Sequence, residues 1–269
     1  MNRCNRSLIV LLMLASSPAW AGKRIQMEST DLQTNNTTPR EVLVDKDRMK
    51  MEVGDNVVMF LTAGGNRMVM IDKANNEFRE MDQASMEAMG KQLSNALSQV
   101  ESLLKNLPQA QREQVEGLLK GKTASGAPVV EPVVFAARGP GTVSGFRCNR
   151  YDGTRSGEKI LEICASTLSD VKLGAQEFQV LEKMREFTTS MIKAVKSTPL
   201  AGMLENTGIT QAGIEGYPVQ SITFQNGKAV SREQVKAIVD ATFTDADFST
   251  GTARKVDLPN LGALGGGAL

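Results

Sequence analysis

Histidine is absent from all 269 residues of the chain. Because histidine is the commonest general base and the commonest transition-metal ligand in proteins, its absence excludes Ser-His catalysis, Cys-His catalysis and the usual zinc hydrolases. The sequence also lacks the G-x-S-x-G, G-x-x-x-x-G-K-[ST] and G-x-G-x-x-G motifs, so neither a nucleophile elbow nor a phosphate-binding loop is recognisable. We therefore expect no enzymatic activity, no metal site and no cofactor.

The chain also lacks an excess of positive or negative charge. The chain has 31 Lys and Arg against 30 Asp and Glu, and removal of a leader with Arg3 and Arg6 would leave 29 basic side chains. Charges of both signs are interspersed, a pattern that does not steer a protein to nucleic acid. Beyond the N-terminus no apolar run approaches the ~20 residues that span a bilayer. We expect a soluble chain that neither spans a membrane nor binds nucleic acid.

The N-terminus has the features of a secretory signal peptide. Two arginines and no acidic residue precede an apolar run at 7–17, and an A-x-A motif ends at Ala21. Basic, apolar and small-residue regions in this order are typical of a signal that is cleaved on export. A membrane anchor is the alternative, but the apolar run is too short for one. The sequence predicts a signal peptide over residues 1–21, cleavage between Ala21 and Gly22, and a periplasmic location.

Cysteine is scarce, with three in the chain. Cys4 precedes the apolar run, whereas a lipoprotein cysteine would follow it, so lipid anchoring is not expected. The other two, Cys148 and Cys164, flank a turn at 152–157 that contains Asp-Gly and Ser-Gly and predicts a hairpin. An even number of cysteines in an exported protein indicates a disulfide, here between Cys148 and Cys164. A redox-active pair is the alternative, but the C-x-x-C spacing is missing.

Apolar and polar residues alternate in short runs over 23–81, which predicts a meander of β-strands. The expected strands are Arg24–Thr34, Arg40–Val53, Asn56–Thr62, Arg67–Lys73 and Glu77–Met81, and later Tyr217–Gln225 and Val235–Phe243. Helical periodicity marks two segments, near 82–121 and 169–208. The order predicts one α+β domain over 22–259, followed by a disordered glycine-rich tail at 260–269.

Methionine is abundant, with 14 in the chain and 12 once Met1 and Met13 are removed. Those on the predicted strands and on the helix that follows are Met49, Met51, Met59, Met68, Met70, Met86 and Met89. Because residues two apart share a strand face, neighbouring strands would give one flexible, polarizable apolar surface. The alternatives are an ordinary sheet core beneath the helix and a copper site built from thioethers.

Two close pairs of carboxylates occur in turn-like sequence, Asp45 with Asp47 and Asp245 with Asp247. Such pairs can bind calcium or act as acid and base, but the other ligands of an EF-hand loop are missing. We interpret all four as solvated loop acids.

Three segments resemble a known group of exported bacterial proteins. LVDKDRMKMEVGDNVVMFL at 43–61, NRMVMIDKANNEFREMD at 66–82 and GFRCNRYDG at 145–153 are similar to domain of unknown function 4412, which looks related to the LolA/LolB-like lipoprotein carriers. The resemblance extends from Lys23 to about Ala165. It implies a curved antiparallel sheet, a half-barrel that wraps amphipathic helices and has an apolar concave face. It carries over no catalytic residue.

Two functions follow as hypotheses. The first is a periplasmic binding protein whose apolar concave site, lined by the seven methionines named above, takes a lipid or an acyl chain. The second is an interaction or envelope-stress module with a closed core, whose partner is an envelope protein. The sequence predicts neither the ligand nor the oligomeric state, and it assigns no role to the helical segment Asp170–Gly208.

Overall fold

The computed structural model describes residues 20–106, 108, 133–194 and 214–258 of the chain. Over these residues twelve strands form a single sheet, in the spatial order β12-β6-β5-β4-β3-β2-β1-β11-β10-β9-β8-β7. Neighbouring strands pair antiparallel, except that the short β12 pairs parallel with β6. The strands are β1 (Trp20–Asp31), β2 (Thr37–Val44), β3 (Arg48–Val53), β4 (Asn56–Leu61), β5 (Arg67–Asp72), β6 (Glu77–Asp82), β7 (Val134–Val143), β8 (Phe146–Arg155), β9 (Glu158–Ser166), β10 (Tyr217–Gln225), β11 (Lys228–Phe243) and β12 (Arg254–Lys255). The helices are α1 (Gln83–Asn106), α3 (Ala175–Ala194) and the short 3-10 helix η1 (Asp245–Phe248).

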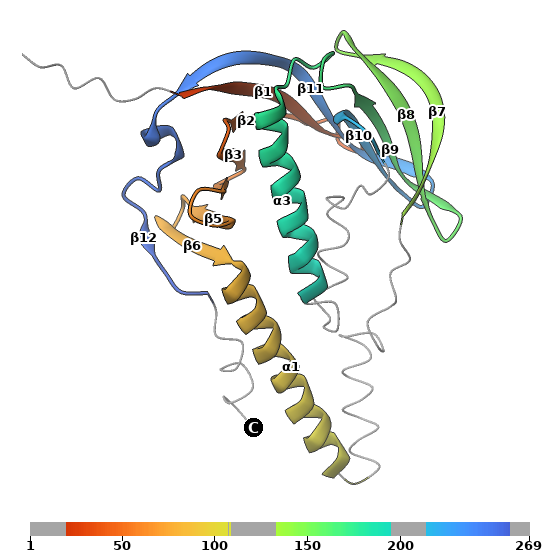
Figure 1. The fold of residues 1–269 in the computed structure, drawn as a ribbon. Coiled ribbons are helices and arrows are strands. Elements are labelled where there is room, and N and C mark those ends of the chain that lie inside the picture. Colours follow the sequence, from red (N-terminus) through yellow and green to blue (C-terminus); the bar gives the residue numbers. More distant parts are fainter. Residues whose placement is uncertain (1–19, 107, 109–132, 195–213, 259–269) are drawn as a thin grey trace, which may run out of the picture.

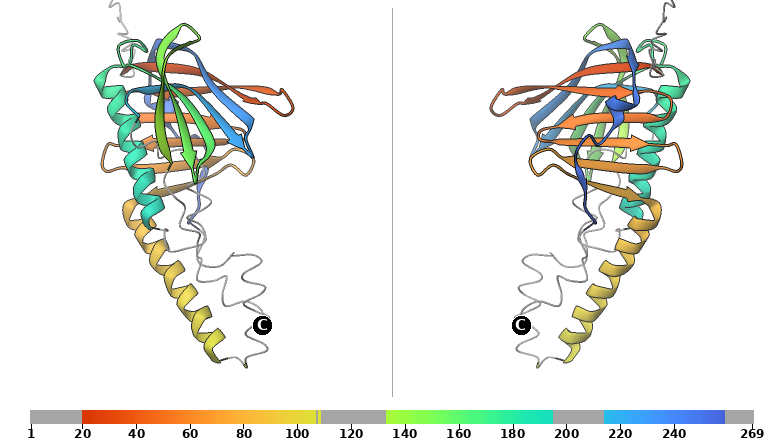
Figure 2. Two further views of the ribbon diagram at one scale, coloured as in Figure 1. Left: turned by 90° about the vertical axis from the view of Figure 1, so that its right-hand side faces the viewer. Right: turned by 90° about the vertical axis from the view of Figure 1, so that its left-hand side faces the viewer.

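The sheet curves into an arch, and α3 lies beneath it on the concave side (Figure 1). Helix α1 starts at the end of β6, contacts α3, and continues beyond the sheet (Figure 2). The arch remains open, because the strand order ends at β12 on one side and at β7 on the other. The predicted curved antiparallel sheet is confirmed. The predicted α+β balance is confirmed only in part, since the described residues are mostly sheet.

The strand predictions fail at one hairpin and at the start of β11, which begins at Lys228 instead of Val235. Residues 40–53, expected to be one strand, form two, β2 and β3. The turn between them is held by Asp45, whose Oδ1 accepts hydrogen bonds from the backbone N–H groups of Asp47 at 2.9 Å and Arg48 at 2.8 Å. An aspartate that bonds the backbone two residues ahead stabilises a turn against a continuous strand.

Apolar side chains gather on both faces of the sheet. The inner cluster lies between the concave face and the helices, and its buried members are Ile25, Val42, Val44, Met49, Phe60, Met81, Met86, Cys148, Cys164, Val171, Leu173, Val180, Phe187, Val219 and Val235. The outer cluster, which includes Phe248 of η1, consists of Leu43, Val57, Met59, Val69, Ile71, Phe243 and Phe248. A third cluster on β9 consists of Leu161, Ile163 and Ala165. Strands β4 and β5 are therefore apolar on both sides, as in a sheet covered on both faces.

Several predictions fall wholly or partly outside the described residues. These are the signal peptide up to residue 19, the tail at 260–269, and most of the helical segments beyond Asn106 and beyond Ala194. Cleavage before Gly22 would remove the first two residues of β1. Among the described helices, none combines the length and the apolar character needed to cross a membrane.

Candidate functional site

Four of the seven predicted methionines share the inner face of the sheet. Met49 on β3 lies opposite Phe60 on β4, and Phe60 lies opposite Met68 on β5. Val58 lies between Met51 and Met70 in the same way. Because alternate residues of a strand point to the same face, these two rows form one surface with Met49, Met51, Met68 and Met70 on it.

Met59 is an exception to the predicted surface. It pairs with Lys50 and Val69, one residue out of step with Phe60, and it belongs to the outer cluster. The register follows from the tight turn that pairs Val53 with Asn56, which assigns odd and even positions of β4 to opposite faces. The prediction that Met59 shares a face with Met49 is therefore wrong.

The helices close most of the methionine surface. Met49 and Met86 are 2% and 3% exposed, and Phe60 is fully buried. The ring of Phe60 meets that of Phe187 on α3, with 5.6 Å between centroids. Met51, Met68 and Met89 are partly buried against the same cluster. Two hollows in the described surface, along β8 near Asp170 and along α3, contain no methionine in their linings.

One end of the methionine surface is uncovered. Met70 is 42% exposed, and it pairs across the sheet with Val58 on one side and Arg79 on the other. Apart from Met59, the structure thus brings the predicted methionines together on the inner side of the sheet, where Met70 is the exposed one among them.

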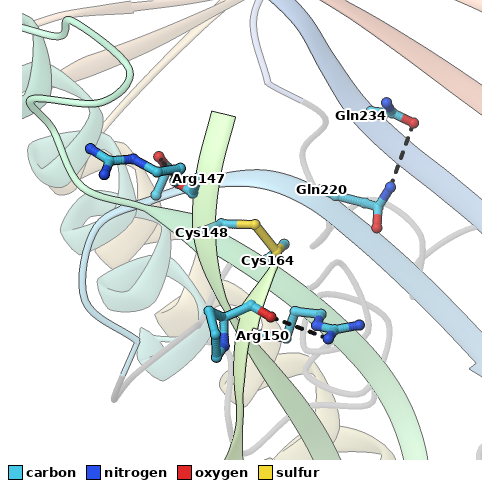
Figure 3. Close-up of a disulfide and its surroundings, with 8 residues drawn as sticks. Arg147, Cys148, Arg150, Cys164, Gln220 and Gln234 are labelled. Carbon is cyan, nitrogen blue, oxygen red and sulfur yellow. Dashed lines mark hydrogen bonds between the residues drawn. A yellow bond between two sulfur atoms is a disulfide. The ribbon is translucent and has the colours of Figure 1, made fainter. Parts of the chain in front are cut away.

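The predicted disulfide is present between Cys148 on β8 and Cys164 on β9, with 5.4 Å between Cα atoms (Figure 3). The turn between the two strands contains Ser156 and Gly157, both with positive φ, as the Ser-Gly dipeptide predicts. Both cysteines are buried, at 7% and 3% exposure. A buried pair without a C-x-x-C spacing has the features of a structural disulfide.

The acidic pairs are joined by one arginine. Arg48 donates from Nε and Nη2 to Asp45 Oδ2, at 2.9 and 2.7 Å, and from Nη1 to Asp245 at 2.7 Å. Asp45 is only 2% exposed, so its interpretation as a solvated loop acid is wrong, whereas the side chain of Asp245 is 77% exposed. The guanidinium also lies over the Phe248 ring, 4.4 Å from its centroid. Arg48 thereby fastens η1 to the β2–β3 hairpin.

A second ion network lies on β7, β8 and β9. Asp152 is 6% exposed, and its carboxylate accepts from Arg138 Nε at 2.5 Å and pairs with Lys159 Nζ at 2.8 Å. Lys159 also donates to Glu162 at 2.6 Å. The hydrogen bond from Lys159, followed by that from Arg138, lowers the pKa of Asp152 against the opposing effect of burial.

The described ranges contain no recognisable metal-binding constellation. Nowhere in that part of the chain do three His, Cys, Asp or Glu side chains converge as metal ligands would. The Asp45 and Asp152 carboxylates are engaged by cations, as described above, so their chemistry is that of structural ion pairs.

Sequence reasoning missed the position of β7 at the edge of the sheet and the arginines around it. The hairpin β7–β8 carries Arg138, Arg147, Arg150 and Arg155 but only one acid, Asp152. This local charge excess was available in the sequence. Its meaning depends on the sheet order, which places β7 at an edge.

The chain matches no family model and no curated protein. Among solved structures, it is similar to an uncharacterized conserved protein from Thermus thermophilus, with a TM-score of 0.40 and 9% identity over 90% of this chain and 92% of that one. For a chain of the MucA/MucB complex from Pseudomonas aeruginosa the TM-score is 0.34, with 10% identity over 88% and 59%. For a DUF1329 family protein from Desulfovibrio piger it is 0.27, with 10% identity over 89% and 93%. At these TM-scores the likenesses carry no argument about family or function.

Proposed function

We propose that this protein is an exported, non-enzymatic interaction module, which binds another protein through its surface while its core stays closed. The observation that carries the proposal is the filled inner face, where Phe60 and Met49 pack against α3 and α1. A lipid or acyl site needs an apolar cavity of a few hundred Å³, whereas Met86 of α1 and Phe187 of α3 pack into the buried cluster on the inner face. The Cys148–Cys164 disulfide supports an oxidising compartment.

A carrier of lipid or acyl chains is the second candidate, and one observation favours it. Met70 is exposed beside Val58 on the inner face, in the row that continues to Met51. An acyl chain laid on this end of the face would contact flexible thioethers, which adapt to variable apolar shapes. Such a site would be an open contact instead of the cavity lined by seven methionines.

Lipid extraction and dye binding separate the two candidates. The purified protein is extracted with organic solvent for mass spectrometry, and a second sample is titrated with N-phenyl-1-naphthylamine. A closed core predicts no copurified lipid and no rise in dye fluorescence, because the inner face is already filled. Copurified lipid would contradict the interaction module.

Two matched variants locate any dye that does bind. Met70→Glu changes the exposed end of the inner face, and Val239→Glu changes a side chain of equal exposure, 42%, on β11. Loss of the dye signal in Met70→Glu alone would establish the carrier at this end of the sheet and overturn our proposal.

A further inference from the structure

The two edges of the sheet differ. The edge at β6 is covered by the chain itself, because Arg254 and Val256 donate backbone N–H groups to Asn76 and Phe78, each at 2.9 Å. At the opposite edge, β7 pairs with β8 on one side, and no described strand pairs with its other side. An unpaired strand edge presents a row of N–H and C=O groups that can accept an added strand.

Only the first part of β7 is regular enough for such pairing. Val134 to Ala137 pair in continuous register with Thr154 to Tyr151, and the register then shifts between Ala137 and Gly139. This bulge, with Gly139 at φ +96° and Pro140 next to it, interrupts the edge. The uninterrupted edge is therefore four residues long, enough for a short extended segment but not for an extended sheet-to-sheet contact.

Three of these four residues are exposed, and the fourth, Phe135, packs inward. Val134 is 64% exposed, and Ala136 and Ala137 are exposed as well. Phe135 points the other way, onto Gly153, where an added Cβ would lie 2.8 Å from its ring. Phe135 also packs against the third cluster, and this contact anchors the strand to β9 in its extended form. A pre-organised strand loses little entropy when a partner pairs with it.

Two arginines lie at the Ala137 end of this edge. The side chain of Arg150 crosses β7 at Gly141, where an added Cβ would lie 3.2 Å from its Cγ, and its Nη2 donates to Pro140 O at 3.2 Å (Figure 3). Within the described part of the chain, Arg150 has no carboxylate partner. Arg138 uses Nε for Asp152, and its side chain is 66% exposed. Guanidinium groups near one end of a strand edge favour carboxylates at the matching end of the segment that pairs there.

We propose that the outer edge of β7 at Val134–Ala137 receives an extended acidic segment of a partner protein by β-strand addition, with carboxylates of the segment facing Arg138 and Arg150. The inference rests on the proposed function and names the surface and chemistry of its partner. Main-chain hydrogen bonds supply binding in this mode, and flanking side chains supply selectivity. A second copy of the chain is disfavoured as the occupant, because its own β7–β8 hairpin carries four arginines and one acid and so lacks the carboxylates that would pair with Arg138 and Arg150.

Fluorescence anisotropy with two labelled peptides tests the proposal. The probes are Glu-Val-Glu-Val-Glu-Val-Glu and its Lys-Val counterpart, titrated with the full mature protein at low and physiological salt. Only the glutamate peptide should bind, and its affinity should fall with salt, because exposed charges are screened over about 8 Å at physiological ionic strength. No binding of the glutamate peptide, or equal binding of both peptides, would overturn the proposal.

Matched variants assign the contact to the edge. Arg150→Gln should weaken the glutamate peptide about 5- to 10-fold, as loss of one charge-assisted hydrogen bond implies. Arg24→Gln, a change of the same charge on the central strand β1, should leave affinity unchanged. Ala136→Asp should weaken binding and Ala136→Lys should not, because the two place opposite charges at one exposed position. The assignment would be contradicted if the two Ala136 variants changed the affinity equally, or if Arg24→Gln weakened binding as much as Arg150→Gln.

Hydrogen–deuterium exchange gives a readout independent of substitution. The peptide should slow exchange of amides at 134–137 and leave β6 unchanged. Protection at other amides would show that the peptide binds at another site, and would contradict the proposal. A dimer detected by light scattering, if Ala136→Asp dissociates it, would show that a second copy of the chain occupies the edge. Failure of this inference leaves the closed core intact, since dye binding and lipid extraction test that separately.

Discussion

Gly22 of β1 lies so close to β2 that no side chain fits. A Cβ built there would be 2.4 Å from the backbone oxygen of Val44 and 2.9 Å from the Phe243 ring. In protein that retains Trp20 and Ala21, so that β1 is complete, Gly22→Ala should destabilise the fold by about 1–3 kcal/mol, because backbone has to move to admit the methyl group. Urea unfolding measures the loss. Gly141→Ala is the control, since its Cβ would meet only the side chain of Arg150, which can move. Equal losses of stability in the two variants would contradict this account.

The Asp45–Arg48–Asp245 contacts predict unequal costs for two substitutions. Arg48→Met leaves the Asp45 carboxylate, 2% exposed, without its cation, and breaking a buried pair this way costs about 3–5 kcal/mol. Asp245→Asn should cost about 0–1 kcal/mol, because Asp245 is exposed to solvent. Chemical denaturation of both variants compares the two costs. A cost for Asp245→Asn as large as that for Arg48→Met would show that Asp45 is not the dominant partner.

Asp152 predicts the sign of the pH dependence of stability. Hydrogen bonds from Lys159 and Arg138 lower its pKa in the folded protein, so its stabilising effect is complete above the ordinary aspartate pKa of about 3.9 and is lost as pH falls through the lower folded value. Thermal unfolding between pH 2 and 6 should show a smaller acid-induced loss for Asp152→Asn than for the unchanged protein. An identical pH dependence would mean that the pair with Lys159 does not form in solution.

At the scale of elements, the disulfide joins β8 and β9 across a sequence separation of 16. Closing a loop of this length should stabilise the protein by ~3 kcal/mol, chiefly by restricting the unfolded chain. The double variant Cys148→Ala/Cys164→Ala should unfold at lower temperature, with the same fold by circular dichroism. Reduction of the wild-type protein should lower its unfolding temperature by a similar amount. If neither the double variant nor reduction changed the unfolding temperature, the disulfide would have no structural role.

Local signals predicted the elements well where turns carry glycine or asparagine. The strand Tyr217–Gln225 was predicted with the bounds it has, and the cysteine hairpin turns at Ser156–Gly157. The turn after Val44 was missed because it is made by a side chain, Asp45, in a sequence that also alternates like a strand. Propensity and periodicity do not distinguish one continuous strand from two strands joined by such a turn.

At the scale of the whole molecule, periodicity gave the methionine surface but not its closure. Alternation placed Met49 with Met51 and Met68 with Met70, whereas Met59 depended on a register that one turn determines. That α3 would bury Phe60 depends on how the sheet curves over the helix, which no local pattern encodes. The exposed edge at β7 likewise follows from strand order alone.

The central claim is that the protein acts by contact with another protein while its core stays closed. Photo-crosslinking in living cells tests it most directly, with a benzophenone amino acid introduced at Val134 on the β7 edge or at Val239 on β11, both exposed. We predict a discrete protein adduct from position 134 that is absent from position 239 and is reduced in yield by Arg150→Gln. No adduct from position 134, or the same adducts from both positions, would contradict the account.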